Sequence, residues 1–227
     1  MSVDLTIVSI GTLSSNPFWN EAPGLRTAHA TTSLVRDAGR VILVDPSLPA
    51  PALLARLFER TGLAAGDVTD VFCTTLRPIH RRSIEAFPEA GWLCAEAELE
   101  ACSSHLEAMA EAAGRIEREQ EALVAEELRL VRRFAPAPDR LTPSVHLFPL
   151  PGPSVGSAGL LLAAPTRTTL IAGDAAVTRE HVEAGRVWSG CADAETAKES
   201  LQEIVEIADL IVCGHDNLML GPIRWGV

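Results

Sequence analysis

Three apolar runs each end close to a side chain that binds metals readily: 70–74 before His80, 168–172 before Asp174, and 210–213 before His215. Residues at strand ends are held on rigid supports and project into the loops where sites are built. Two imidazoles and a carboxylate are a plausible ligand set for zinc or iron. Spacing alone does not bring the three loops together, so the sequence predicts a candidate metal site that the fold has to assemble.

Strands and helices alternate along the chain in two similar halves. In the first half we expect strands at 5–10, 32–35 and 40–44, a helix at 50–61, and a strand that ends at Thr74. In the second half we expect strands at 145–150, 159–163 and 168–172, a helix at about 194–208, and a strand at 210–213. This order fits an α/β fold of two sheets with outer helices, an αββα sandwich.

A long helical stretch, from about residue 95 to 133, separates the two halves. Apolar residues recur in it at helical spacing: Leu99, Cys102, Leu106, Met109, Ala113, Ile116, Leu123, Leu128 and Val131. Pro136 and Pro138 end the stretch. Such a stripe favours two helices packed on the core. A lid over the active face or the surface of a homodimer fits the same stripe.

The composition indicates a protein with a sizeable core and no membrane span. The chain has 227 residues, 47% of them hydrophobic, a length that allows one or two domains. We expect no membrane association, because no apolar run approaches the ~20 residues that cross a bilayer. The run 3–10 contains Asp4 and lacks a basic start, so it indicates a first strand rather than a signal peptide.

Cysteine usage and net charge indicate the redox environment of the protein and exclude one class of partner. The five cysteines are scattered and never form a C-x-x-C pair: Cys73, Cys94, Cys102, Cys191 and Cys213. Several lie in apolar strands, where cysteine is usually a small core residue, and we expect a reducing cytoplasm. The formal charge of −11 repels phosphate backbones, so we expect no nucleic-acid partner.

The motifs around the candidate ligands resemble those of the metallo-β-lactamase superfamily over nearly the whole chain. Five landmarks occur in the right order: 32–35 with 40–45, 74–80 with 87–90, 150–152, 171–174 and 213–216. The run Thr-Arg-Glu-His at 178–181 is most similar to the lactonase-like hydrolase branch. The resemblance implies a four-layer αββα sandwich of two mixed sheets. It also implies one domain over 1–227, with a helical insertion at about 95–135.

Several positions that hold metal in that superfamily carry other residues here. The superfamily loop reads His-x-His-x-Asp-His, and its first three ligand positions are Thr75, Arg77 and Ile79 in this chain. Only His80 remains in the loop. Pro153 stands where the next superfamily histidine follows Pro-Gly. The resemblance therefore implies that the histidines of one metal are lost.

The other metal position keeps most of its ligands. His80, the bridging Asp174 and His215 match the superfamily ligands, with Asp174 as the candidate catalytic residue. The resemblance implies one zinc or iron ion, or none. Asp45 matches the aspartate that supports the ligand loop. Val177 replaces the tyrosine that lactonases carry after the bridging aspartate, and this chain has no tyrosine.

Arg77 is the residue that opposes metal binding most directly, because it is always charged. At ~4 Å from a divalent ion and an effective dielectric of ~20, the repulsion is roughly 8 kcal/mol. Complete structural zinc sites bind with only ~10–16 kcal/mol. Arg77 can avoid the ion by turning toward Asp45 or solvent. Alternatively, its guanidinium takes the place of the first metal and pairs with Asp174, which would suit a carboxylate or phosphate ligand.

Two functional classes therefore stay open. The first is a hydrolase in which one metal activates water that Asp174 orients, acting on an ester, lactone or thioester. The second is a pseudoenzyme that binds a small anionic molecule or a protein partner in the same cleft. His29 or His181 could supply a fourth ligand to the metal of the first class. An iron oxidoreductase is disfavoured, since the iron-binding members of the superfamily need the lost histidines.

Overall fold

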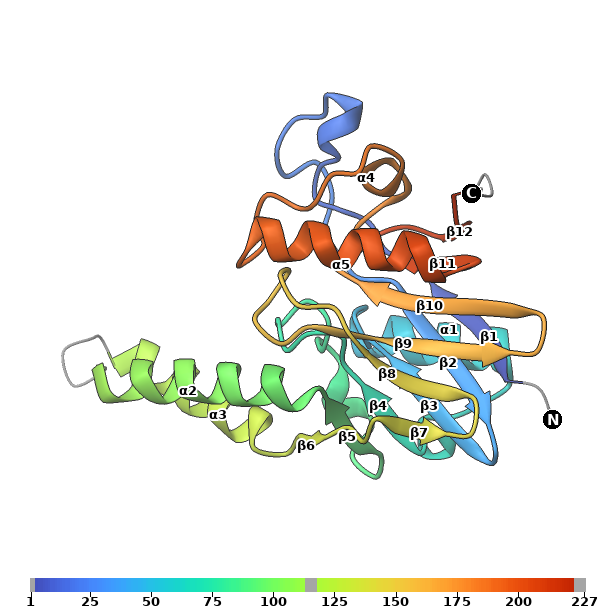
Figure 1. Cartoon of the computed structure of the whole chain (residues 1–227). Coiled ribbons are helices and arrows are strands. Elements are labelled where there is room, and N and C mark those ends of the chain that lie inside the picture. The colour runs from blue at the N-terminus through green and yellow to red at the C-terminus, as the bar shows by residue number, and fades with distance from the viewer. Residues whose placement is uncertain (1–2, 113–117, 223–227) are drawn as a thin grey trace.

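The computed structural model describes residues 3–112 and 118–222, and these form two six-stranded sheets packed face to face (Figure 1). The first sheet has the order β1-β2-β3-β4-β5-β6: Asp4–Ser9, Thr32–Asp37, Arg40–Val44, Asp70–Phe72, Gly91–Cys94 and Ala135–Pro136. The second has the order β12-β11-β10-β9-β8-β7: Leu218–Leu220, Leu210–Cys213, Arg167–Gly173, Ala158–Ala164, Val145–Pro149 and Arg140–Thr142. Both sheets mix parallel and antiparallel pairs.

The strands alternate their side chains between two apolar layers, which explains their continuous hydrophobic sequences. Between the sheets, Ile42 and Phe72 of the first sheet belong to one buried cluster with Leu160, Ile171 and Val212 of the second. The opposite faces carry apolar side chains too, so each sheet needs a covering helix. Both mixed sheets of the expected α/β sandwich are thus present.

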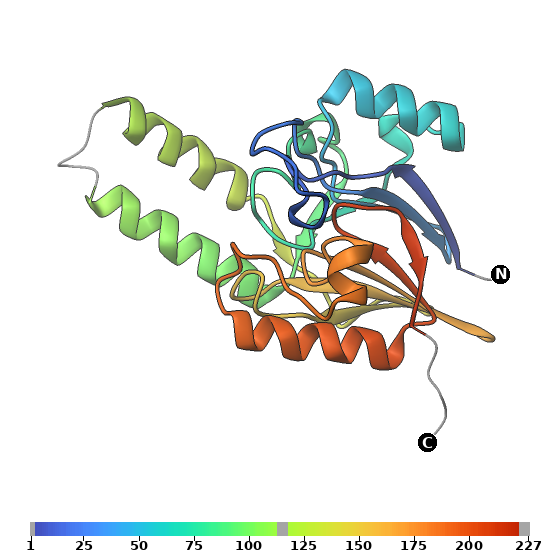
Figure 2. The same cartoon turned by 90° about the horizontal axis from the view of Figure 1, so that it is seen from above.

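Two helices cover the outer faces of the sandwich (Figures 1 and 2). Helix α1, Ala50–Thr61, buries Leu53 and Leu57 against the first sheet and ends at Gly62, which adopts a left-handed conformation. Helix α5, Ala194–Ile207, packs on the second sheet. Its first turn is capped by Asp193, which accepts hydrogen bonds from the backbone N–H groups of residues 195 and 196.

The expected helical stretch between the halves contains α2, Glu96–Ala112, and α3, Arg118–Val131, which extend together away from the sheets (Figure 2). Near the sandwich the stripe is buried, as Leu106, Leu128 and Val131 show. Farther out it is exposed: Met109 is 40% and Leu123 is 66% accessible. Two further stripe residues, Ala113 and Ile116, lie outside the described residues.

The short elements were not expected from the sequence. They are β5, β6, β7 and β12 in the sheets, the helix α4 at Arg179–Glu183, and three 3₁₀ turns at Pro17–Trp19, Ala65–Asp67 and Ile84–Ala86. Among the described residues, no helix is long and apolar enough to cross a membrane.

Candidate metal centre

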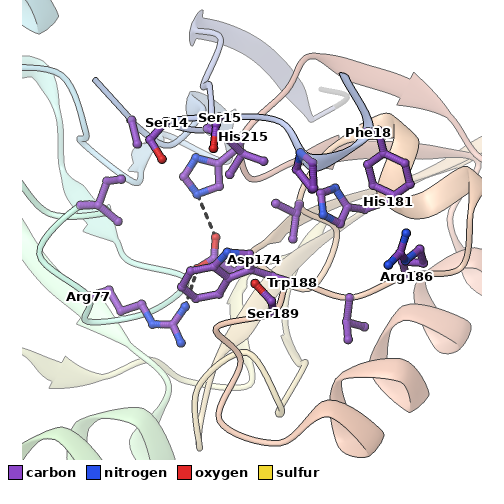
Figure 3. Close-up of a pocket in the computed structure, with 16 residues that line it drawn as sticks. Ser14, Ser15, Phe18, Arg77, Asp174, His181, Arg186, Trp188, Ser189 and His215 are labelled. Carbon is purple, nitrogen blue, oxygen red and sulfur yellow. Dashed lines mark hydrogen bonds and ion pairs between the residues drawn. The ribbon is translucent and has the colours of Figure 1, made fainter. Parts of the chain in front are cut away.

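Three side chains from three loops converge at one edge of the sandwich, namely His80, Asp174 and His215. Their potential ligand atoms all lie within 4.8 Å of one another, and all three residues are buried. Oδ1 of Asp174 is 3.2 Å from Nε2 of His80 and 3.1 Å from Nε2 of His215, the second contact being drawn in Figure 3. The structure therefore brings together the three residues that the sequence nominated as metal ligands.

Parallel pairing and two glycines place these loops in contact. Strands β10 and β11 are parallel neighbours, so Asp174 and His215 leave the sheet side by side. Gly173 has φ of +53°, and a Cβ there would lie 2.4 Å from Oγ1 of Thr74. A Cβ on Gly214 would lie 2.5 Å from the carbonyl oxygen of Gly173. Only glycine allows the loops that carry the three ligands to approach so closely.

The Nδ1 atoms of His80 and His215 each contact an oxygen atom outside the cluster. Nδ1 of His80 is 3.0 Å from Oδ2 of Asp45, and Nδ1 of His215 is 3.0 Å from the carbonyl oxygen of His29. Asp45 is itself fixed, because it accepts hydrogen bonds from the backbone N–H and the hydroxyl of Thr74 at 2.8 and 2.7 Å. Such contacts orient a ring so that its Nε2 faces a metal. Asp45 therefore contacts His80 on the side of its ring that faces away from the cluster.

The centre of the cluster requires positive charge. Because a carboxylate and a carbonyl oxygen can only accept, both Nδ1 atoms carry protons, and neutral rings would turn bare Nε2 lone pairs toward the Asp174 carboxylate. His80 Nε2 is fully buried and, despite its 3.2 Å distance from Asp174, makes no well-aligned hydrogen bond within the described residues. A cation or additional protons must therefore lie between these Nε2 lone pairs and the Asp174 carboxylate.

The titration of the cluster follows the same electrostatics. Burial alone lowers the pKa of His80, but the Asp174 and Asp45 carboxylates outweigh it and raise that pKa to about 10. Burial raises the pKa of Asp174, whereas the two imidazoles hold it well below its usual range. Asp174 is thus ionised, and it supplies the negative charge that a metal ligand needs.

Arg77 forms an ion pair with Oδ2, the second oxygen of the Asp174 carboxylate. Its Nη1 donates to Oδ2 of Asp174 at 3.0 Å, and its Nη2 donates to the carbonyl oxygens of Pro153 and Gly190, the latter at 3.1 Å. The guanidinium also stacks over the ring of Trp188, 4.5 Å from its centroid. Of the orientations considered from the sequence, the structure has the one that pairs with Asp174 (Figure 3).

A pocket of about 380 Å³ opens above the cluster (Figure 3). Asp174, His215 and Arg77 line it, together with apolar residues that include Phe18 and Val177. The other polar or charged residues at its wall are Ser14, Ser15, His181, Arg186 and Ser189. The pocket therefore combines apolar and polar side chains, with Asp174 and His215 of the cluster among the polar ones.

The two additional histidines considered from the sequence differ in place. His29 contributes only its carbonyl oxygen to the cluster, because its ring turns away and its Nε2 contacts the carbonyl oxygen of Ile10 at 3.0 Å. His181 lines the pocket, and its Nδ1 contacts the hydroxyl of Thr178 at 2.9 Å. Neither ring belongs to the described group of potential ligands.

The sequence matches no protein-family model and no curated protein. Solved structures, in contrast, match nearly the whole chain. A candidate metallo-β-lactamase from Thermotoga maritima superposes with a TM-score of 0.70 over 97% of this chain and 100% of its own, at 18% identity. The chain has the metallo-β-lactamase fold.

Two lactonases share this metallo-β-lactamase fold with the chain. The dizinc quorum-quenching lactonase AidC, with the product N-hexanoyl-L-homoserine, matches 86% of this chain and 76% of its own at 16% identity and a TM-score of 0.66. A variant of AiiA from B. thuringiensis, with N-decanoyl-L-homoserine at its active site, matches 95% and 94% at 20% identity and a TM-score of 0.64. Identities this low establish the fold alone.

Two positions that the superfamily resemblance assigns to histidine lie at or beside a buried hydrogen-bond network. Thr75 is buried and turns its hydroxyl away from the cluster, donating to Oε1 of Glu98 at 2.7 Å. The other Glu98 oxygen accepts from Ser154 at 2.7 Å and from the backbone N–H of Gly156 at 3.2 Å. The backbone N–H of Leu76 completes the set at 2.9 Å. Glu98 thereby ties both loops to α2.

Sequence reasoning missed Glu98, and no local signal identifies it. A glutamate in the first turn of a helix is usually solvated, and its acidic character there is explained by the helix dipole. Its burial becomes visible only when the loops that contain Thr75 and Ser154 are placed against α2.

These residues fit one divalent ion and not two. His80, Asp174 and His215 offer three ligands with pre-oriented imidazoles, and the pocket leaves an open side for water or substrate. A second ion would have to share Asp174 with the Arg77 guanidinium. The two further positions that the superfamily resemblance assigns to histidine hold Thr75 and Pro153.

Proposed function

We propose that the chain is a one-metal hydrolase that cleaves an ester-type carbonyl bond, in an ester, a lactone or a thioester. The observation that carries this proposal is the convergence of His80, Asp174 and His215 beneath the pocket, with both imidazoles oriented from behind. The lactonases of the same fold, which hold homoserine products, support an ester-type substrate.

The proposed ion is zinc or iron, held by the two Nε2 atoms and the Asp174 carboxylate. When bound, such an ion polarises a carbonyl and lowers the pKa of a coordinated water. Asp174 accepts a hydrogen bond from water at the pocket floor and so directs a lone pair of that water upward, toward the substrate. The apolar wall, which includes Phe18 and Val177, packs against an acyl chain and excludes bulk water.

Arg77 gives this site a feature of its own. Three of its five N–H groups donate to Asp174, Pro153 and Gly190, and the remaining two have no acceptor among the described residues. In our proposal one of these hydrogens donates to the carbonyl oxygen of the substrate, where negative charge develops during attack. The guanidinium thus supplies fixed positive charge on the side of the site that lacks histidines.

Metal content and hydrolysis test the proposal together. Protein purified without chelator, and protein equilibrated with zinc, should each hold about one ion per chain by elemental analysis. The loaded protein should hydrolyse N-hexanoyl-L-homoserine lactone or p-nitrophenyl hexanoate, and Asp174→Asn and His215→Ala should abolish that activity. His105→Ala, a change at an exposed residue of α2, is the matched control. A folded chain that binds no zinc would refute the proposal.

A second candidate is a metal-free protein that binds a small anion. It is favoured by the ion pair between Arg77 and Asp174, which balances that carboxylate without a metal, and by Arg186, a second guanidinium at the same pocket. This candidate predicts no stoichiometric metal. It also predicts that hexanoate binds to the wild type and that Arg186→Gln abolishes this binding.

A further inference from the structure

His181 is a buried histidine at the pocket wall that the proposed hydrolysis does not use. It lies in α4, is 3% exposed, and packs edge-on against the ring of Phe18 at 4.9 Å (Figure 3). Its Nδ1 is 2.9 Å from the hydroxyl oxygen of Thr178. Its Nε2 has no hydrogen-bond partner in the described part of the chain. This atom is also not fully buried, and the residue lines the pocket. Nε2 is therefore the polar atom that His181 offers to the pocket.

The neighbours of Thr178 determine which nitrogen of His181 carries the proton. The Thr178 hydroxyl donates to Oε2 of Glu180 at 2.8 Å. Glu180 can only accept, because it is ionised: burial raises its pKa, but the hydrogen bonds from Thr178, Trp19 and Asn16 lower it overall. A hydroxyl has one hydrogen, so Thr178 must accept from its other neighbour. That neighbour is Nδ1 of His181, which therefore carries the proton.

The ring is neutral, so Nε2 is left with a bare lone pair. Burial lowers the pKa of His181, and the positive charge of Arg186 lowers it further, against the opposing effect of Glu180. A neutral imidazole with its proton on Nδ1 presents an acceptor at Nε2. Most other polar side chains at the wall, the serines and the two arginines, can donate. Among the side chains that line the pocket away from its floor, His181 is the acceptor that cannot reorient into a donor.

We propose that Nε2 of His181 accepts a hydrogen bond from an N–H group of the ligand, so that the pocket prefers acyl compounds with a secondary amide. The chain Glu180–Thr178–His181 fixes the ring in the tautomer that accepts. This inference rests on the proposed function for the class of ligand, an acyl compound in the pocket. It does not depend on the metal, on hydrolysis or on the identity of the reacting bond.

The tautomer is tested first, without any ligand. Long-range ¹H–¹⁵N correlation spectra of uniformly ¹⁵N-labelled protein, assigned by comparison with His181→Phe, should show His181 with a protonated Nδ1 and an unprotonated Nε2 at neutral pH. Thr178→Val removes the acceptor and should move the ring toward the other tautomer, whereas Thr178→Ser keeps the hydroxyl and should preserve it. A proton on Nε2 in the wild type would overturn the inference.

Recognition is tested with a matched pair of probes, N-butylhexanamide and N-butyl-N-methylhexanamide, which differ in one N–H group. Calorimetric titration should show about three- to tenfold tighter binding of the secondary amide, the value of one hydrogen bond. His181→Phe should remove this preference, and His181→Gln, whose amide oxygen reaches a similar position, should restore part of it. Circular dichroism checks that each variant is folded.

The outcomes separate this inference from the proposed function. Equal affinity of the wild type for the two amides, or no binding of either, overturns the role of His181 even where zinc binding and hydrolysis are intact. A preference that survives in folded His181→Phe overturns it as well. If instead the chain binds no zinc, the one-metal hydrolase is refuted, while the tautomer and the amide preference still stand on their own measurements.

Discussion

Replacing Arg77 by glutamine should strengthen metal binding. The guanidinium holds Oδ2 of Asp174 at 3.0 Å, while the two histidines face Oδ1 of the same carboxylate. With a metal–oxygen bond of about 2 Å, an ion at Oδ1 would lie on the order of 6 Å from the centre of the guanidinium charge. Glutamine keeps a hydrogen-bond donor at this position and removes the charge.

The size of the effect depends on how well solvent screens the guanidinium. At about 6 Å and an effective dielectric of about 20, a divalent ion and a single positive charge repel by roughly 5–6 kcal/mol. The Arg77 side chain is 26% accessible, so screening is substantial, and full water screening would leave about 1.4 kcal/mol. Because about 1.4 kcal/mol is a factor of ten, we expect zinc affinity to rise at least about tenfold and at most about 10⁴-fold.

Competition calorimetry against a zinc chelator measures this change. Arg77→Lys, which keeps the charge, should bind zinc no more tightly than wild type, and Arg82→Gln, which removes a charge outside the pocket, should leave the affinity unchanged. The gain in Arg77→Gln should shrink as salt is added. An affinity of Arg77→Gln equal to that of wild type, in folded protein, would show that the guanidinium swings away when the ion enters. The electrostatic reasoning would then be wrong.

Three other predictions follow from contacts around the site and between the sheets. Asp45→Asn should lower zinc affinity about 10–100-fold, because His80 loses the carboxylate that orients its ring; an unchanged calorimetric titration would contradict this role. Glu98→Gln should lower the free energy of unfolding by about 1–3 kcal/mol in urea, because its amide N–H₂ would face hydrogen-bond donors of the loops; stability equal to wild type would mean that the four contacts are replaced by water. Burial raises the pKa of Asp37, but hydrogen bonds from Thr142 and Ser144 lower it overall, so its stabilising effect is present above the ordinary pKa of about 3.9 and is lost as pH falls through the lowered value. Urea denaturation of wild type and Asp37→Asn should differ by a constant amount above about pH 4 and converge in stronger acid.

The strand ends and the candidate ligands were predictable because both depend on patterns that stay close together in the chain. Apolar runs gave most of the strands, and His80, Asp174 and His215 follow three of them. Glu98 was not predictable, since its burial depends on loops about 20 and 60 residues away. The orientation of Arg77 was left open for the same reason. Its carbonyl partners at Pro153 and Gly190 carry no side-chain signal in the sequence.

The four hydrogen bonds to Glu98 affect how this site could change by substitution. Thr75 and Ser154 lie at or next to two positions that the superfamily resemblance assigns to histidine, and both donate to the buried side chain of Glu98. A single Thr75→His substitution would remove one hydrogen-bond donor from that buried carboxylate and so destabilise the protein. A second metal could offset this loss of stability only after its other ligands were also in place. Building a second metal position therefore requires coupled substitutions, at Glu98 as well as at Thr75. Each of these residues therefore constrains the others, because substituting one alone leaves a buried polar group without its hydrogen-bond partner.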